Sequence, residues 1–236
     1  MTETELRAGQ IPFHFGHFDS FDFALFVPGV NKDVYQKLQQ ITPMEDSICI
    51  YLWGQPGTGK SHLLHATCKA VAEAGGSTAY VPLAQCNEIE PGLLQGLGSR
   101  DLVCIDDIDR ISGDRDWELA LLHLYNQLRD DRHSIIIAGH TAPKAIELQL
   151  QDLKSRLSWG LTYRLKQLAD ETKIAILKMR ARNRAFELPD EVASFLLNRV
   201  GRDMPNLMSI LDRLDTASLA AQRKITIPFV KALLKE

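Results

Sequence analysis

Short apolar runs alternate with longer amphipathic stretches from residue 47 onward. Five continuous runs are typical of strands covered on both faces, and they occupy 47–53, 77–82, 101–106, 134–139 and 161–165. Between them, residues 62–76 and 116–131 repeat apolar side chains at intervals of three and four, which predicts helices. The alternation predicts an α/β fold in which helices sandwich a parallel five-stranded sheet.

The strand pattern ends at Gln167, and the rest of the chain has helical periodicity. Helices are predicted within 169–186, 189–200, 204–224 and 228–236. We therefore predict three parts, namely an aromatic-rich tail at 1–26, an α/β domain at 27–167 and a small all-helical lid domain at 168–236. The cationic run Lys178, Arg180, Arg182 and Arg184 in the helical part is interpreted as a solvated helix face, with phosphate contact as the alternative.

Composition excludes several classes of protein. A chain of 236 residues with 45% hydrophobic and 24% charged residues is neither disordered nor collagen-like. No apolar run approaches the roughly 18 residues of a membrane span, and the N-terminus lacks the apolar core of an export signal. The net charge of -3 gives no overall attraction to nucleic acid. We expect a cytoplasmic protein without a membrane partner, whose contact with DNA is weak or indirect.

Four cysteines lie far apart and form no CxxC pair, which argues against a zinc or redox motif. We interpret Cys49, Cys68, Cys86 and Cys104 as buried thiols in a reducing compartment.

A phosphate-binding motif directly follows the first predicted strand. Residues 54–61 read GQPGTGKS, which fits the P-loop pattern G-x-x-x-x-G-K-[ST] and opens a predicted helix. Backbone N–H groups of such a loop surround phosphate oxygens, and the helix N-terminus adds partial positive charge. Lys60 is expected to reach the terminal phosphates and Ser61 to bind Mg²⁺. The predicted nucleotide contacts here are Gly54, Gln55, Pro56, Gly57, Thr58, Gly59, Lys60, Ser61 and His62.

Two acids end the third predicted strand. Asp106 is expected to hold Mg²⁺ together with Ser61, and Asp107 to polarise an attacking water. His62 and His65 stand three residues apart on the helix after the P-loop, but no third metal ligand is evident nearby. We interpret them as packing residues rather than a metal pair.

The remaining chain narrows the class of P-loop protein. A GTPase is expected to carry an N-K-x-D tetrapeptide, and none is found. A nucleotide kinase needs an Arg-rich lid, whereas the segment after residues 134–143 holds one arginine before Arg164. An ATPase remains.

The chain resembles the AAA+ module of the bacterial replication initiator DnaA. The resemblance lies in VPGVNKDVYQKL at 27–38, GKSHLLHA at 59–66, VCIDDI at 103–108, DLKSRLSWGLTYRL at 152–165 and QRKITIPFVKALL at 222–234. A full initiator continues into a helix-turn-helix domain, for which this sequence leaves no room. The resemblance therefore implies a truncated regulatory paralogue that binds ADP or ATP with Mg²⁺.

The resemblance also implies roles for particular residues. The adenine base is expected near Phe26, Pro28 and Gly29. Arg156, within S-R-L-S-W-G, matches the family's arginine finger, which is supplied in trans to nucleotide on a neighbouring subunit. The alternative for Arg156 is a local ion pair with Asp152, four residues earlier.

The N-terminal tail holds a candidate clamp-binding motif. Six of the nine phenylalanines fall between residues 13 and 26, more aromatic surface than a free tail tolerates. Gln10, Phe13 and Phe15 fit the pattern Q-x-x-[hydrophobic]-x-[hydrophobic], which inserts into an apolar groove of the replicative sliding clamp, the β subunit of DNA polymerase III. The alternative is packing of this segment on its own domain.

Two positions depart from the family pattern. His140 stands where a polar first-sensor residue, often Asp, is common, and Pro205 stands where the second-sensor arginine is expected. Arg202 lies three residues earlier, and the sequence leaves open whether it substitutes. These departures weaken the expectation of fast intrinsic hydrolysis.

The leading hypothesis is a nucleotide-binding adaptor that holds the sliding clamp and uses Arg156 to stimulate ATP hydrolysis on DnaA, thereby inhibiting initiation of DNA replication. A second copy of the chain is a further candidate partner. The first alternative is an autonomous ATPase such as a helicase loader, in which Asp107 serves its own site. The second is a single-strand DNA-binding module that uses the basic helix around Arg180.

Overall fold

The computed structural model describes residues 21–43, 47–221 and 224–234. The proposed clamp-binding residues Gln10, Phe13 and Phe15 lie outside the described residues, so that interpretation stays a prediction.

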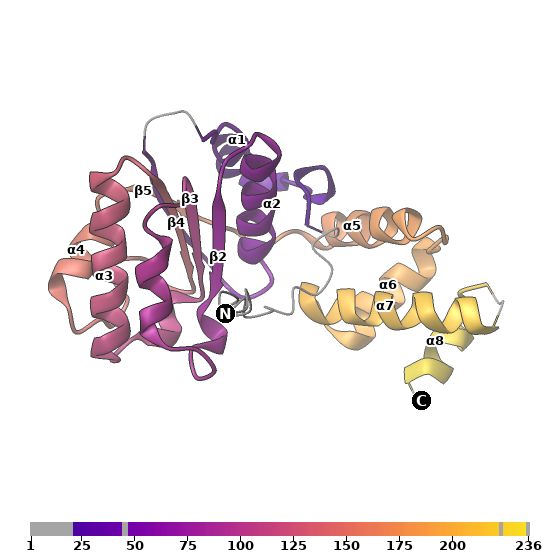
Figure 1. Ribbon diagram of the computed structural model, residues 1–236. Helices are drawn as coiled ribbons and strands as arrows, with labels where there is room; N and C mark the ends of the chain where they lie inside the picture. Colours follow the sequence, from indigo (N-terminus) through magenta and orange to yellow (C-terminus); the bar gives the residue numbers. More distant parts are fainter. Residues whose placement is uncertain (1–20, 44–46, 222–223, 235–236) are drawn as a thin grey trace, which may run out of the picture.

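The first domain is built on a parallel sheet, and the predicted fold class is confirmed (Figure 1). The strands follow the order β2-β3-β4-β1-β5. Their bounds are β1 (Cys49–Trp53), β2 (Thr78–Pro82), β3 (Leu102–Asp106), β4 (Ser134–Gly139) and β5 (Leu161–Arg164). Ile50 of β1 pairs with Ile136 of β4 on one side and with Leu161 of β5 on the other.

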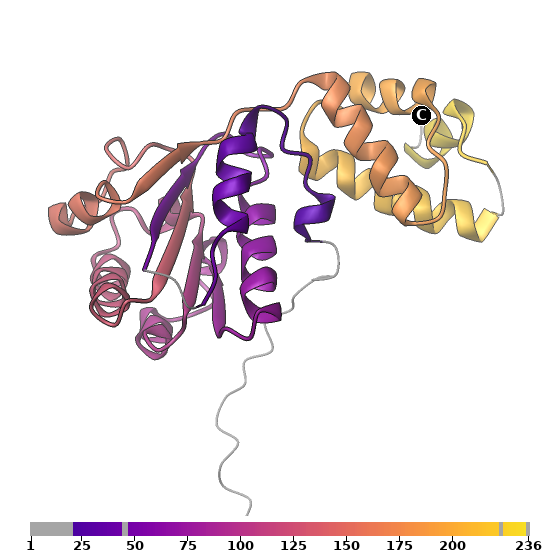
Figure 2. The ribbon, with the colours of Figure 1, turned by 90° about the horizontal axis from the view of Figure 1, so that it is seen from above.

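Helices cover both faces of this sheet (Figures 1 and 2). The helices α1 (Lys32–Gln39) and α2 (Lys60–Glu73) lie on one face, whereas α3 (Arg115–Asp130) and α4 (Gln151–Leu157) lie on the other. Alternate residues of a strand point to opposite faces, so Val103 and Ile105 pack toward α3 while Leu102 and Cys104 pack toward α2. The sheet therefore separates two cores.

Short 3₁₀ helices connect the main elements. They are η2 (Phe23–Leu25), η3 (Gly29–Asn31), η4 (Leu83–Gln85), η5 (Pro91–Leu97) and η6 (Ile108–Ile111).

Coverage of the strands is less complete than their apolar runs predict. The inner strands β3 and β4 are buried throughout, but β5 is an edge strand and three of its four residues are exposed. The expectation that every strand is covered on both faces is therefore wrong for β5. The cysteines are likewise mixed: all four are free thiols, but only Cys68 and Cys104 are buried.

The C-terminal helices form a lid with its own apolar core. It contains α5 (Asp170–Asn183), α6 (Asp190–Val200), α7 (Met204–Ala221) and α8 (Ile227–Leu234). Pro189 caps the start of α6, where its missing N–H costs nothing. Figures 1 and 2 place this lid beyond α2, on the side of the sheet opposite α3 and α4. No helix in the described residues is long and apolar enough to cross a membrane.

Candidate functional site

Three strands of the sheet end at one edge of the molecule. Because β1, β3 and β4 are parallel neighbours, their carboxyl ends meet there. The P-loop follows β1, Asp106 ends β3, and His140 follows β4. We call residues 54–61 with Asp106, Asp107 and His140 the P-loop edge.

The loop's backbone has the conformation that its glycines allow. Gly57 and Gly59 have φ angles of 75° and 95°, in the left-handed region that favours glycine. A Cβ on Gly59 would lie 2.7 Å from Cε2 of Phe26, so the aromatic ring packs directly against the loop. The buried Thr58 hydroxyl donates to the carbonyl of Gln55 at 2.9 Å and closes the turn. The loop therefore has the compact, glycine-dependent conformation that the phosphate-binding motif predicts.

Lys60 is directed into this cradle. Its side chain is buried, and Nζ donates to the carbonyl oxygens of Gly54 at 2.7 Å and Gln55 at 3.2 Å. Burial lowers the pKa of this ammonium, and Asp106 and Asp107 act against that shift. The lysine is thus held at the loop that is predicted to receive phosphate.

Asp106 is buried and held from two sides. The Tyr80 hydroxyl on β2 donates to its Oδ2 at 2.8 Å, and the backbone N–H of Asp107 donates to its Oδ1 at 3.0 Å. Ser61 is exposed in the first turn of α2. A hydroxyl and a carboxylate are the hard oxygen donors that Mg²⁺ prefers, so this pair fits the predicted ion together with phosphate and water.

Asp107 and His140 form the second part of this edge. Asp107 adopts a left-handed conformation, with φ of 55°, and burial followed by the charge of Asp106 raises the pKa of its carboxyl. His140 lies between two acids, with Nε2 4.0 Å from Oδ1 of Asp107 and Nδ1 3.2 Å from Oδ2 of Asp109. Asp109, which the sequence analysis did not single out, therefore orients the residue at the first-sensor position.

The segment predicted to lie near the base borders the P-loop. Phe26 packs on Gly59 and stacks on Tyr35, with ring centroids 5.7 Å apart. Pro28 is half-buried directly before η3, and a Cβ on Gly29 would lie 3.3 Å from Leu168, where the chain enters the lid. The structure thus brings the segment 26–29, the P-loop and the start of the lid together.

The lid reaches the P-loop through the start of α7. A Cβ on Gly57 would lie 3.0 Å from Oδ1 of Asp203 and 3.2 Å from Cδ of Pro205. The position expected for a second-sensor arginine therefore borders the loop, with a proline in it. Arg202 instead pairs with Asp170, at 3.2 Å, and its side chain is 66% exposed.

His62 and His65 contact other elements from α2. His62 lies within hydrogen-bond distance of the Asp22 carbonyl and of Arg180 on α5. The ring of His65 lies against those of Phe21 and Tyr80. No group of three or more candidate metal ligands occurs in the ranges that the structure describes. Sequence reasoning did not find Tyr80 or the role of Arg180, since nothing in the local pattern signals their partners.

Arg156 belongs to α4, which packs on the face of the sheet opposite the P-loop helix α2 (Figure 1). Its guanidinium carbon is 4.5 Å from the centre of the Trp159 ring, and its carbonyl accepts a hydrogen bond from the Tyr125 hydroxyl. Trp159 is 66% exposed and Leu161 44% exposed. Asp152 and Arg156 are both described, and no ion pair joins them. We call Arg156, Trp159 and Leu161 the arginine edge.

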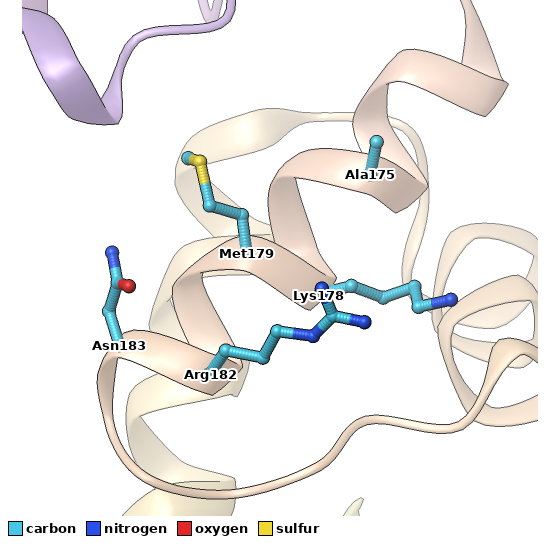
Figure 3. Close-up of a pocket in the computed structure, with 5 residues that line it drawn as sticks. All are labelled: Ala175, Lys178, Met179, Arg182 and Asn183. Carbon is cyan, nitrogen blue, oxygen red and sulfur yellow. The ribbon is translucent and has the colours of Figure 1, made fainter.

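The cationic run on α5 is partly engaged in ion pairs. Lys178 pairs with Asp190 at 2.5 Å, and Arg184 pairs with Asp212. A cavity of about 300 Å³ lies along the exposed side of α5, and Figure 3 shows that the side chains of Lys178 and Arg182 extend toward the same side, whereas Met179 points in another direction. None of the predicted nucleotide contacts lines it, so this cavity is separate from the P-loop edge.

Comparisons with known families match two parts of the chain. Residues 170–234 match a family model described as the lid domain of Hda, and residues 87–164 match the bacterial DnaA ATPase domain. The P-loop at 54–61 lies before both matched ranges, so its assignment rests on its own sequence and geometry.

Solved structures share the fold. Domain III of the Thermotoga maritima replication initiation protein DnaA is 23% identical over 92% of this chain and 96% of that one, with a TM-score of 0.77. DnaA from Aquifex aeolicus bound to AMPPCP is 21% identical over 85% of this chain and 67% of that one, with a TM-score of 0.68. The Thermotoga maritima RuvB Holliday junction branch migration motor is 18% identical over 91% and 73%, with a TM-score of 0.64.

Proposed function

Because the chain is an Hda-like protein of the DnaA family, we propose that it is a nucleotide-binding adaptor that stimulates ATP hydrolysis by DnaA and so restrains initiation of DNA replication. The proposal has three parts: a nucleotide held at the P-loop edge, an arginine supplied in trans from the arginine edge, and a clamp-binding tail.

The P-loop edge supports binding of ADP or ATP. Backbone N–H groups of the glycine-rich loop and the N-terminus of α2 would receive phosphate oxygens, and Lys60 would exchange its bonds to the loop carbonyls for bonds to phosphate. Mg²⁺ held through Ser61 and Asp106 would neutralise negative charge on the phosphates. Phe26 would place an apolar surface beside the base.

The position of the half-buried Arg156 on α4, away from the chain's own P-loop, carries the proposal. Arg156 lies on α4, which packs with α3 on one face of the sheet, whereas the chain's own P-loop opens α2 on the other face. A cation so placed is available to a nucleotide on another molecule. The exposed ring of Trp159 holds the guanidinium and supplies apolar surface for a partner.

The action of Arg156 would be electrostatic. In phosphoryl transfer, negative charge spreads over the oxygens of the transferred group, and a guanidinium aimed at them is worth about 10³–10⁵ in rate. The chain's own site is less well equipped for this step, because Pro205 borders the P-loop where a second cation is expected. This difference favours hydrolysis in the partner's site.

Gln10, Phe13 and Phe15 are the proposed contacts with the sliding clamp. An extended peptide binds such a groove through a few apolar anchors, and a glutamine amide satisfies backbone groups at the rim. Tethering to the clamp would raise the effective concentration of Arg156 near DnaA wherever the clamp is loaded on DNA.

A single-turnover experiment tests the proposal. Decay of ATP bound to DnaA is measured with DNA-loaded clamp and either the wild type, Arg156→Ala, or the triple variant Gln10→Ala, Phe13→Ala and Phe15→Ala. We expect the wild type to accelerate decay and both variants to lose that acceleration. Arg164→Ala is the matched control. Like Arg156, Arg164 lies over an indole, that of Trp53, but Arg164 belongs to β5 and not to α4.

An unchanged decay rate with the wild type would reject the adaptor role. The leading alternative is then an autonomous ATPase, for which Asp107 beside the buried Asp106 is the candidate base. Turnover without any partner, lost in Asp107→Asn, would identify that activity.

A further inference from the structure

His62 lies where three separate elements meet. It belongs to the first turn of α2, two residues after Lys60. Its Nε2 is 2.9 Å from the carbonyl oxygen of Asp22, at the start of the described chain, and its Nδ1 is 3.2 Å from Nη2 of Arg180 on the lid helix α5. One imidazole therefore contacts the N-terminal segment and the lid at the same time.

The partners of His62 determine its tautomer. A guanidinium can only donate hydrogen bonds, so Nδ1 must accept from Arg180. Nε2 must then carry the hydrogen, which it donates to the Asp22 carbonyl. A neutral imidazole satisfies both contacts, which lie 40 and 118 positions away along the chain.

The N-terminal segment 21–26 docks around this histidine. The ring of Phe21 stacks on His65 at 4.8 Å and meets the edge of His62 at 5.4 Å. The ring of Phe26 lies 5.4 Å from that of His62 and packs on Gly59. Asp22 also pairs with Lys69 of α2, at 2.9 Å. The segment is thus attached to α2 on both sides of His62.

Arg180 is linked to the P-loop through α5 and the start of α7. Arg180 and Lys173 lie on the same helix, and Lys173 donates from Nζ to the carbonyl of Arg202, directly before α7. The start of α7 borders Gly57 of the P-loop. A displacement of α5 would therefore shift both His62 and the lid residues over the loop.

We propose that His62 is a positioning residue that couples closure of the lid and docking of segment 21–26 to nucleotide binding. Both ring nitrogens of His62 are already engaged by Asp22 and Arg180, so in this proposal it acts through these neighbours and not as the nucleotide contact that the sequence pattern predicted. It would hold the end of the P-loop, the lid and Phe26 in the arrangement that binds nucleotide, so that release of either partner lowers affinity. This inference rests on the proposed nucleotide binding at the P-loop edge.

A double-mutant cycle on ADP affinity tests the coupling. Isothermal titration with ADP and Mg²⁺ compares the wild type with His62→Phe, Arg180→Met and the double variant. His62→Phe keeps an aromatic ring but removes both hydrogen bonds. We expect each single variant to weaken ADP binding about 5- to 20-fold. The affinity of the double variant should lie within about twofold of the affinity of the weaker-binding single variant, as for two residues that act as one unit.

Two further variants separate positioning from a general loss of structure. Arg182→Met is the matched control, because Arg182 lies on the same helix but is exposed, and its affinity should equal that of the wild type. His62→Gln offers an amide donor and a carbonyl acceptor and should restore affinity to within about threefold. Hydrogen exchange of residues 21–26 should accelerate in His62→Phe and not in His62→Gln.

Other results would overturn the inference. Effects of His62→Phe and Arg180→Met that multiply in the double variant would show independent roles, such as direct contact of Arg180 with nucleotide. Wild-type affinity in His62→Phe would show that the junction carries no coupling. Failure of the wild type to bind ADP would reject nucleotide binding and this coupling with it, whereas exchange at 21–26 would still report whether His62 holds the segment.

Discussion

The P-loop edge and the arginine edge of this protein differ in how their charged groups are held. At the P-loop edge, Lys60 and Asp106 are buried, and every polar contact described for them lies within the domain. At the arginine edge, the guanidinium of Arg156 rests on an exposed indole, next to the exposed Leu161. The first arrangement is closed around its own chain and the second is open to another molecule.

Under the proposed function, this difference would separate nucleotide binding at the P-loop edge from stimulation of hydrolysis by the arginine edge. Buried charges held by short hydrogen bonds form a rigid cradle whose ligand must come to it. A cation on an exposed aromatic surface gains most of its interaction energy only when a partner excludes water from it. The predictions below test this contrast, from the largest expected effect to the smallest.

Removal of the buried Lys60 should produce the largest difference in ADP affinity between a variant of the P-loop edge and a variant of the arginine edge. Lys60→Ala deletes the ammonium that would bind phosphate, and we expect ADP affinity to fall by about 100-fold or more, the equivalent of two charge-assisted hydrogen bonds. Isothermal titration measures the change. Arg156→Ala is the control and should bind ADP as the wild type does. Equal losses in both variants would contradict the separation.

The start of α4, the helix that carries Arg156 of the arginine edge, is held by the buried Glu118. Glu118 of α3 is fully buried and accepts hydrogen bonds from the backbone N–H groups of Gly113, Gln149 and Leu150, the last of which caps α4. Glu118→Gln should lose an acceptor at the start of α4 and destabilise the fold by about 1–3 kcal/mol. Denaturant unfolding measures this loss. The exposed Glu147, mutated to glutamine, should show less than about 0.5 kcal/mol.

Removal of the Trp159 indole, which lies against the Arg156 guanidinium, should have a smaller effect. Trp159→Ala removes an exposed cation–π contact worth about 0.5–1 kcal/mol, so stimulation of DnaA should fall about two- to fivefold. ADP affinity should stay at the wild-type value. The single-turnover assay measures the first quantity and titration the second. A stability loss comparable to that of Glu118→Gln would show that Trp159 serves the fold rather than the partner.

The smallest expected effect is the pH dependence of the stability that Asp22 contributes in the N-terminal segment. The backbone N–H of Ala24, and next the ammonium of Lys69, lower the pKa of the Asp22 carboxyl below its ordinary value of 3.8. Because the pKa is lowered in the folded state, the ionised carboxylate stabilises the fold at pH values above its ordinary pKa. This stabilisation is lost as the pH falls through the lowered pKa. The difference in unfolding free energy between the wild type and Asp22→Asn should therefore shrink below about pH 4. The exposed Asp33, mutated to asparagine, is the control.

Much of the fold was predictable because its signals are local. The five strands and the helices α2 and α3 follow from apolar periodicity, and the order of glycines before Lys60 predicts the loop conformation that Gly57 and Gly59 adopt. The exception was β5, whose apolar run resembles that of a covered strand although it lies at the sheet edge. Periodicity reports the spacing of apolar side chains and not the number of neighbouring strands.

By itself, the sequence determined the α/β class, the P-loop after the first strand, the acids after the third and the resemblance to DnaA, because each is written in residues close together along the chain. Only the tertiary structure decided that Tyr80 holds Asp106, that Arg180 reaches His62 and that α4, which carries Arg156, packs on the face of the sheet opposite the P-loop helix α2. These contacts join residues on different elements, 26 and 118 positions apart for the first two. They depend on how layers pack, since side chains that meet across elements leave no periodic trace in either segment.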